Sequence, residues 1–303
     1  MIKEKVRNTL IVVFALVFMV TLLPASASAE GKTLRIVLED WTSEIASGNL
    51  VKAVLKKKLG VNCILKRMSV TDQYTAISNG TADALLGAWL PSQDPYYQLH
   101  KGDFVDLGPN LEGARLGLVV PQVSSTWLVA EDGQKTEPYM LIDSTEEIKD
   151  HYDDFDGKIV GIEVDSGMMK TMRERLLPAY GLEDFELVYG DEVSMTSALA
   201  NAIKRKQWIV VVGWTPHWKF GRWNLKFLDD PKNIWGASAR INTLVRKGLK
   251  EDMPNVYKVL DKFNWTPSDM EQLLVWNEMK DAPYDNALRW MNYNRKSVDS
   301  WTK

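Results

Sequence analysis

The stretch LRIVLEDWTSEIASGNLVKAVLKKKLGVNCIL, residues 34–65, contains two short apolar runs separated by an amphipathic segment. The runs 34–38 and 61–65 are predicted as β-strands, because they are short, apolar and bounded by polar residues or glycine. The segment 43–59 is predicted as a helix that ends at Gly60. One face of this helix carries the apolar residues Leu50, Val51, Val54, Leu55 and Leu59. A strand, a helix and a second strand in this order are typical of an α/β protein.

The same alternation continues along the chain. We predict further strands at residues 82–88, 116–120, 158–164, 186–189 and 208–213, and helices at 72–79, 168–179 and 194–206. A helical tail starts at Thr266, which is a good capping residue followed by proline at the first helical position. Two α/β series follow each other without a low-complexity linker, so we expect two lobes that exchange chain segments.

The first 29 residues are predicted to be a secretory signal peptide. Three basic residues precede the apolar run 9–23, and the small residues of PASASA, 24–29, fit cleavage after Ala29. The apolar run is short of the about 20 residues that a membrane helix needs. An uncleaved N-terminal anchor is the alternative. Because no cysteine lies near the cleavage point, we expect no lipid anchor and a location in the periplasm.

Composition and motifs argue against several function classes. The formal net charge is −3 without a basic run, which gives no electrostatic footprint for nucleic acid. The histidines His100, His151 and His217 lack metal-ligand spacing, and the single cysteine, Cys63, is predicted to be a core residue. The sequence has no Gly-x-Ser-x-Gly motif and no Walker loop, so we predict no catalytic residues, no metal and no cofactor. The rival class is an enzyme that uses scattered carboxylates for acid–base chemistry on a small solute.

Tryptophans stand at the ends of three predicted strands. The chain has twelve tryptophans, and Trp41, Trp89 and Trp214 each follow such a strand, as does the turn at Gly167-Met168. In open α/β sheets, ligands bind in the crevice beyond the carboxyl ends of the strands. We therefore expect these three indoles and this turn to build one binding site.

A site made of indoles suits a quaternary ammonium group, which carries a positive charge but has no N–H to donate. Each aromatic face contributes about 0.5–2 kcal/mol, so three contribute roughly 2–6 kcal/mol. Micromolar affinity needs about 8 kcal/mol, and a second anchor is required. The turn 165–169 offers one, because free backbone N–H groups at the start of a helix bind a carboxylate. Gly167 would permit close approach of the backbone.

Six stretches carry a resemblance to a known family. They are EDWTSEIAS (39–47), AWLP (88–91), VDLGPNLEG (105–113), SGMM (166–169), VGWTPHW (212–218) and KFLDDP (226–231). On these stretches the sequence resembles the glycine betaine-binding proteins of ABC importers over nearly the whole mature chain. The resemblance implies a type II periplasmic-binding fold with two α/β lobes joined by two crossing segments. With the signal peptide at residues 1–29, it places lobe I at 30–117 plus 241–303 and lobe II at 118–240.

The resemblance also implies the roles of the site residues. Trp41, Trp89 and Trp214 would form the cation cage, and the backbone N–H groups of Gly167 and Met168 would hold the carboxylate. The ligand would then bridge the lobes and favour their closed state. The implied partners are a small quaternary ammonium solute and an ABC permease at the inner membrane, and the protein is expected to be a monomer.

One position departs from the family pattern. The most similar subgroup has a histidine five residues after the tryptophan of Trp-Leu-Pro, whereas this chain has Asp94. An ionised aspartate only accepts hydrogen bonds and would repel a carboxylate. One alternative is that a neighbour such as Gln93 donates to the carboxylate instead. The other is that the ligand is not glycine betaine but choline, whose hydroxyl could donate to Asp94, or carnitine. His217, near Trp214, is a further candidate contact, with a structural role as the alternative.

Overall fold

The computed structural model describes residues 32–122, 140–236 and 238–303. The predicted signal peptide, residues 1–29, and part of the predicted lobe II, 123–139, lie outside the described residues.

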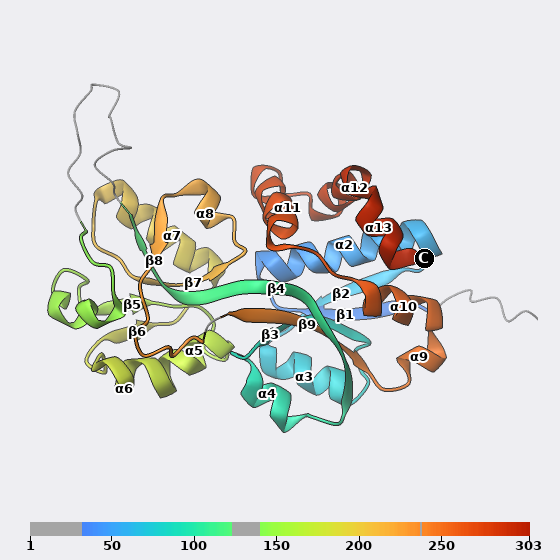
Figure 1. Cartoon of the computed structure of the whole chain (residues 1–303), viewed down its shortest axis with the longest axis horizontal. Coiled ribbons are helices and arrows are strands. Elements are labelled where there is room, and N and C mark those ends of the chain that lie inside the picture. The colour runs from blue at the N-terminus through green and yellow to red at the C-terminus, as the bar shows by residue number, and fades with distance from the viewer. Residues whose placement is uncertain (1–31, 123–139, 237) are drawn as a thin grey trace, which may run out of the picture. The chain divides into compact units, whose positions relative to one another are not determined.

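Strands and helices alternate along the described chain, which confirms the predicted α/β class (Figure 1). The strands are β1 (Leu34–Leu38), β2 (Cys63–Arg67), β3 (Ala84–Leu90), β4 (Phe104–Pro121), β5 (Lys158–Val160), β6 (Glu186–Val188), β7 (Val211–Thr215), β8 (Leu225–Phe227) and β9 (Ala239–Arg246). The helices are α2 (Thr42–Leu59), α3 (Val70–Ser78), α4 (Asp94–Leu99), the 3₁₀ helix η1 (Thr145–His151), α5 (Gly167–Thr171), the π-helical turn η2 (Met172–Leu176), α6 (Leu177–Tyr180), α7 (Glu192–Arg205), α8 (Lys219–Arg222), α9 (Leu249–Asp252), α10 (Pro254–Lys262), α11 (Pro267–Met279), α12 (Pro283–Tyr293) and α13 (Arg295–Thr302).

The strands are hydrogen-bonded in the order β2-β1-β3-β9-β4-β7-β5-β6, and β8 also pairs with β4. Pairing is parallel among β1, β2 and β3 and among β5, β6 and β7. It is antiparallel wherever β4 or β9 takes part. Two parallel groups are therefore connected through an antiparallel centre.

The long strand β4 belongs to both groups (Figure 1). Its first part pairs with β9, from Phe104 opposite Arg246 to Ala114 opposite Ala239. Its last part, from Arg115 onward, pairs with β7 and β8. We call the elements around β1, β2, β3 and β9 the first half, with α2–α4 and α9–α13. The elements around β5, β6, β7 and β8 are the second half, with η1, η2 and α5–α8.

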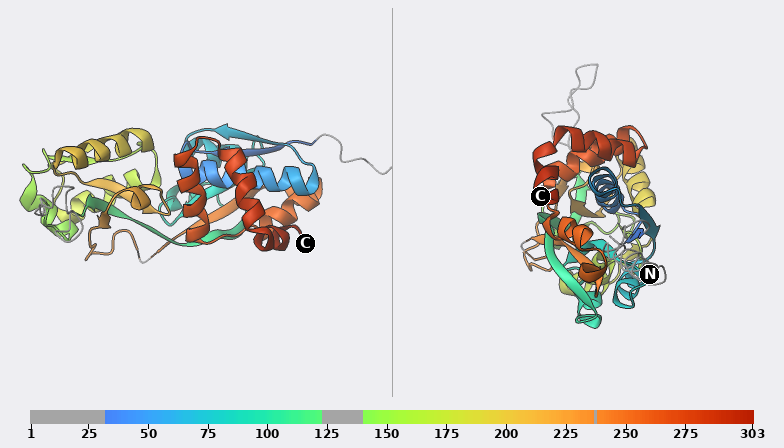
Figure 2. Two further views of the ribbon diagram at one scale, coloured as in Figure 1. Left: turned by 90° about the horizontal axis from the view of Figure 1, so that it is seen from above. Right: turned by 90° about the vertical axis from the view of Figure 1, so that its right-hand side faces the viewer.

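Helix α2 has the boundaries that its sequence dictates. It ends at Gly60, whose φ of 72° is left-handed and whose N–H bonds the carbonyl of Lys56. Its buried face includes Leu50, Val54 and Leu55. It packs against α10, α11 and α12, and Figure 2 shows it beside these C-terminal helices. Its N-terminus, which follows Trp41, is thereby held in place.

The predictions for β1, α2 and most helices are confirmed, but several strand boundaries were wrong. β2 begins at Cys63 rather than at residue 61, and β5 ends at Val160 rather than at 164. β4 begins at Phe104, whereas the predicted strand started at 116. β9 was not predicted. The chain leaves β5 early because the next residues form the loop that reaches the first half.

The only cysteine of the chain, Cys63, is buried at the start of β2, as predicted. Burial raises the pKa of its thiol to about 12. None of the helices in the described ranges is long and apolar enough to cross a membrane.

Candidate ligand-binding site

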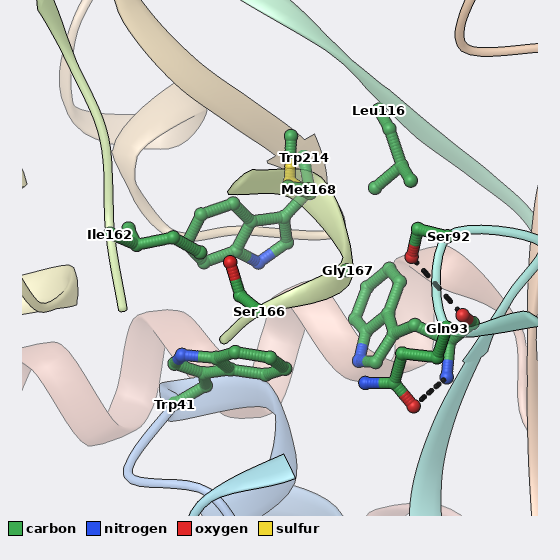
Figure 3. A pocket seen from close by; sticks show the side chains of 10 residues that line it. Trp41, Ser92, Gln93, Leu116, Ile162, Ser166, Gly167, Met168 and Trp214 are labelled. Atoms are coloured by element: carbon green, nitrogen blue, oxygen red, sulfur yellow. Dashed lines mark hydrogen bonds between the residues drawn. The ribbon is translucent and has the colours of Figure 1, made fainter. Parts of the chain in front are cut away.

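One pocket lies where loops and strand ends of the two halves meet (Figure 3). The space inside it that is open to the centre of a water molecule is small, about 20 Å³. It is lined by Trp41, Trp89, Ser92, Gln93, Leu116, Ile162, Ser166, Gly167, Met168 and Trp214. All five residues for which the sequence predicts a cage or carboxylate role are among them. The structure therefore brings together side chains that are more than 170 positions apart in the sequence.

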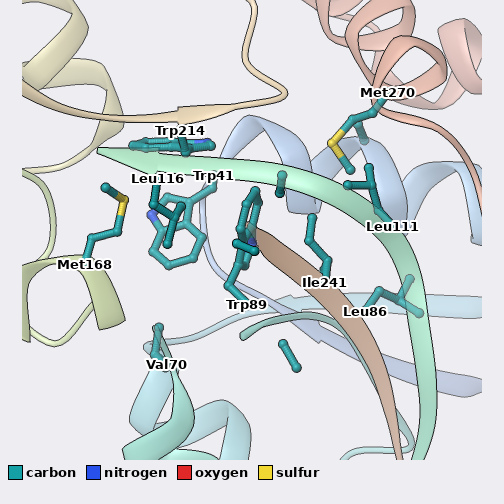
Figure 4. Close-up of a cluster of buried hydrophobic side chains, with 14 of the residues drawn as sticks. Trp41, Val70, Leu86, Trp89, Leu111, Leu116, Met168, Trp214, Ile241 and Met270 are labelled. Atoms are coloured by element: carbon teal, nitrogen blue, oxygen red, sulfur yellow. The ribbon is translucent and has the colours of Figure 1, made fainter. Parts of the chain in front are cut away.

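Three indoles dominate the lining. The side chains of Trp41, Trp89 and Trp214 are 6%, 4% and 3% exposed. The ring centroids of Trp41 and Trp214 are 6.4 Å apart with planes tilted by 48°, so these rings are not stacked on each other. Figure 4 shows the third indole, Trp89, beside them with Leu116 nearby. The pocket is thus a largely aromatic and apolar enclosure.

A carboxylate of the second half fixes the ring of Trp41. Its indole N–H donates to Oε2 of Glu163 at 2.8 Å, across 122 positions of sequence. Glu163 follows β5, in the loop where a longer strand was predicted. Burial raises the pKa of Glu163, and the indole N–H opposes this by stabilising the ionised form.

Further carboxyl groups lie close to Trp41. The backbone N–H of Glu39 donates to Oε2 of Glu44 at 2.7 Å, and Glu44 is fully buried. Burial raises the pKa of Glu39 to about 7, with the nearby Glu163 contributing, and burial raises that of Glu44 as well. Burial thus favours the neutral form of both carboxyl groups.

Other polar contacts cross between the halves around the pocket. The hydroxyl of Tyr96 donates to the carbonyl of Asp165 at 2.6 Å. The hydroxyl and backbone N–H of Thr42 donate to the carboxylate of Glu192 at 2.7 and 3.0 Å. The two halves are therefore in direct contact on more than one side of the site.

Gly167 lies close to the backbone of the first half. A Cβ at this position would lie 2.4 Å from the carbonyl oxygen of Ser92 and 3.0 Å from the backbone nitrogen of Gln93. Contacts under 3.0 Å with backbone atoms cannot be accommodated without movement of the chain. Glycine is therefore required here because the boundary between the two halves leaves no space for a side chain.

The turn at Gly167 and Met168 presents unbonded backbone N–H groups. Ser166 caps the following helical segment, because its Oγ accepts from the N–H of Met169 at 3.2 Å. Within the described residues, no group accepts a hydrogen bond from the N–H of Gly167 or Met168. Both residues line the pocket, so these N–H groups are available at its wall.

Sequence reasoning missed Lys219, which lies beside Trp214. Its Nζ is 4.0 Å from the centroid of the Trp214 ring, the side chain is fully buried, and no described group forms a hydrogen bond with Nζ. It does not line the pocket. Burial lowers the pKa of Lys219 to about 7. No sequence signal marks it, since a lysine after a tryptophan-rich turn is ordinarily a surface residue.

His217 serves the framework of the site and is not among the lining residues. Its Nδ1 accepts from the N–H of Lys219 at 3.0 Å, and its Nε2 lies 3.1 Å from Oε1 of Glu192. Burial lowers the pKa of His217 to about 4. Burial alone would raise the pKa of Glu192, but His217 and the donors of Thr42 outweigh it and hold that pKa at about 2.

The two remaining candidates differ in position. Asp94 is the first residue of α4 and is not among the lining residues, whereas its neighbour Gln93 is. In the described parts of the chain, no three His, Cys, Asp or Glu side chains are grouped so that they could hold a metal ion.

Residues 32–293 match the family described as the substrate-binding domain of the ABC-type glycine betaine transport system. The chain belongs to this family. By description, its members are substrate-binding domains of a transport system. The resemblance stated from sequence motifs is confirmed.

Several relatives of this substrate-binding domain are named for the solute that they bind. The chain is 44% identical over 148 residues to the glycine betaine/carnitine transport binding protein GbuC of Listeria monocytogenes, and the match covers 48% of each chain. The chain thus spans about half the length of this curated relative. Lactococcal OpuAC, crystallised closed with glycine betaine, is 36% identical with a TM-score of 0.79, covering 90% of this chain and 100% of that one. An ABC-transporter choline-binding protein in complex with choline is 26% identical with a TM-score of 0.76, covering 89% and 91%. The predicted two-lobe fold is therefore confirmed.

Proposed function

We propose that this protein captures glycine betaine, or a closely related quaternary ammonium solute, and delivers it to the permease of an ABC importer. The observation that carries the proposal is the pocket lined by Trp41, Trp89 and Trp214 from both halves. Indole faces attract a cation that cannot donate hydrogen bonds, and they bury its methyl groups at the same time.

The second anchor in this proposal is the turn at Gly167 and Met168. Their backbone N–H groups have no acceptor among the described residues and would donate to the carboxylate of the ligand. Cation and carboxylate would then be held by different walls of one enclosure, which suits a zwitterion. The similarity to GbuC, a glycine betaine/carnitine transport binding protein, and to OpuAC, crystallised with glycine betaine, supports this assignment. Carnitine and choline are the alternatives, supported by the names of GbuC and of the choline-binding protein.

We assign residues 30–117 plus 241–303 to one lobe and 118–240 to the other. Strand β4 supports a boundary near residue 117, because it changes partners from β9 to β7 between Ala114 and Arg115. The ligand would touch both lobes and so stabilise the closed state through its differential affinity. The protein would act in the periplasm as a monomer, after removal of residues 1–29.

Calorimetry with glycine betaine, proline betaine, carnitine and choline tests the proposal directly. We expect binding of at least one, without chemical turnover, together with a change in tryptophan fluorescence. If the purified protein binds none of the four, the proposed function is wrong. If it converts one of them to a product, the protein is an enzyme.

Replacement of either Trp89 or Trp214 by alanine should weaken binding about tenfold or more, since each loses about 1–2 kcal/mol of cation–π attraction. The matched control is Trp276→Ala on α11, where the indole packs against Arg289 outside the pocket. Calorimetry on the three variants measures the effect. Unchanged affinity in both Trp89→Ala and Trp214→Ala would rule out the cage.

A further inference from the structure

We propose that the side-chain amide of Gln93 donates a hydrogen bond to the carboxylate of the ligand and selects betaines over choline. This inference rests on the proposed function and names the subclass of solute that the site prefers.

The orientation of the Gln93 amide is fixed by its neighbours. Its Oε1 accepts from the backbone N–H of Trp89 at 3.1 Å and from the hydroxyl of Tyr74 at 3.1 Å. A backbone N–H can only donate, so the atom that it meets must be the amide oxygen. The amide nitrogen is therefore on the other side of the group, as Figure 3 shows. If the amide were rotated so that its nitrogen and oxygen changed places, the hydrogen bond from the N–H of Trp89 would be lost.

The amide nitrogen has no partner although it is buried. Gln93 is 1% exposed, and no described group accepts a hydrogen bond from Nε2. Buried donors are nearly always paired in folded proteins. Since Gln93 lines the pocket, an acceptor supplied by the ligand would satisfy this donor.

Gln93 also lies next to the proposed carboxylate anchor. Its backbone nitrogen would be 3.0 Å from a Cβ at Gly167, which places the start of α4 against the turn of the second half. Gln93, Gly167 and Met168 all line the same pocket, so their donors can serve one bound ligand. A carboxylate there could accept from both halves at once. Asp94 is outside the lining and adds no competing acceptor to it.

The chemical group that accepts from Gln93 determines how much binding free energy each ligand gains. A carboxylate accepts charge-assisted hydrogen bonds, which are roughly twice as strong as those between neutral groups. The hydroxyl of choline would receive only a neutral bond from the same amide. We therefore expect the wild-type protein to bind glycine betaine at least tenfold more tightly than choline.

The decisive variant is Gln93→Glu, studied by calorimetry at pH 7.5. The new carboxyl keeps one oxygen for the donors of Trp89 and Tyr74, but replaces the amide nitrogen by a second oxygen. We expect glycine betaine affinity to fall tenfold or more and choline affinity to be unchanged or higher. The matched control is Gln98→Glu, which makes the same change at an exposed position of α4 and should alter neither affinity.

A second variant, Gln93→Met, removes the donor without adding charge. It should lower glycine betaine affinity and leave choline affinity within twofold of wild type, with thermal unfolding used to verify the fold. The inference is overturned if Gln93→Glu binds glycine betaine as wild type does, or if both variants lose both ligands equally. It is also overturned if the wild-type protein prefers choline. Failure of the wild-type protein to bind any quaternary ammonium solute would instead refute the proposed function.

Discussion

The ammonium group of Lys219 is costly to bury near the site. It is fully buried against the indole of Trp214, with Glu192 as the opposite charge that partly compensates it. Desolvation of a charge with no hydrogen-bond partner destabilises the folded state. The side chain of Lys219 also packs against the indole of Trp214, since its Nζ lies 4.0 Å from the ring centroid. The site thus contains a group that reduces stability and contacts a proposed ligand-binding residue.

Lys219 should make the protein more stable as pH rises. Its pKa is about 7 in the folded chain against 10.5 for an ordinary lysine. Between these values the unfolded chain binds the proton that the folded chain has lost, so the free energy of unfolding increases with pH. Lys219→Met should remove this increase and raise stability at pH 7 by on the order of 1 kcal/mol or more.

Urea unfolding of both proteins from pH 7 to 10 measures this effect. Lys101→Met, at an exposed lysine, is the control and should follow the wild-type curve. Parallel curves for wild type and Lys219→Met would show that the ammonium is not the titrating group.

At the scale of single elements, the sequence predicts those that are stabilised locally. α2 is confirmed at almost every position because a periodic apolar face and a left-handed glycine at residue 60 define it. The first part of β4 was missed because it carries Asp106, Pro109 and Glu112, and its pairing with β9 has register shifts at these residues. Such an irregular strand is held by its partner rather than by its own pattern.

The candidate site likewise has residues that could be predicted from the sequence and contacts that could not. Trp41 and the turn at Gly167 were predicted because a position after a strand is visible in the sequence. Trp89 and Trp214 were also expected after a strand, but they lie inside β3 and β7, near the ends of these strands. The contacts from Trp41 to Glu163 and from Thr42 to Glu192 were not predicted, since they join positions 122 and 150 residues apart. Single-sequence patterns contain no information on such pairs.

The short element α5 begins at a position where only glycine fits. Gly167→Ala would place a methyl group 2.4 Å from the carbonyl oxygen of Ser92, so the halves could not approach fully. We expect glycine betaine and choline affinity to fall together by tenfold or more, with little change in thermal stability. Gly221→Ala in α8 is the matched control, because its Cβ would meet only Val275 at 3.8 Å. A Gly167→Ala protein that binds as wild type does would contradict the close approach.

For the molecule as a whole, affinity depends on contacts between the halves as well as on contacts with the ligand. Hydrogen bonds from Tyr96, Trp41 and Thr42 to the second half exist only when the halves are together. Ligand binding and closure are therefore linked equilibria, and a change in one appears in the other.

Tyr96→Phe should show this linkage without altering the pocket lining. It removes the hydrogen bond to the carbonyl of Asp165, which contributes about 0.5–1.5 kcal/mol. All ligands should lose affinity by the same factor, roughly twofold to tenfold. Tyr97→Phe removes a comparable bond to Asp106 within the first half and should leave affinity unchanged. Calorimetry with glycine betaine and choline distinguishes this uniform loss from a selective one.

The burial of Cys63 has a practical consequence for measuring the closure of the two halves. With its thiol inside the first half and its pKa near 12, the native cysteine should stay inert toward maleimide reagents. Fluorophore pairs can therefore be attached through introduced thiols, for example at Lys57→Cys and Lys204→Cys on exposed faces of α2 and α7, without first deleting the natural one. Energy transfer between the dyes would then report solute capture in real time, and the protein becomes a starting point for an optical sensor.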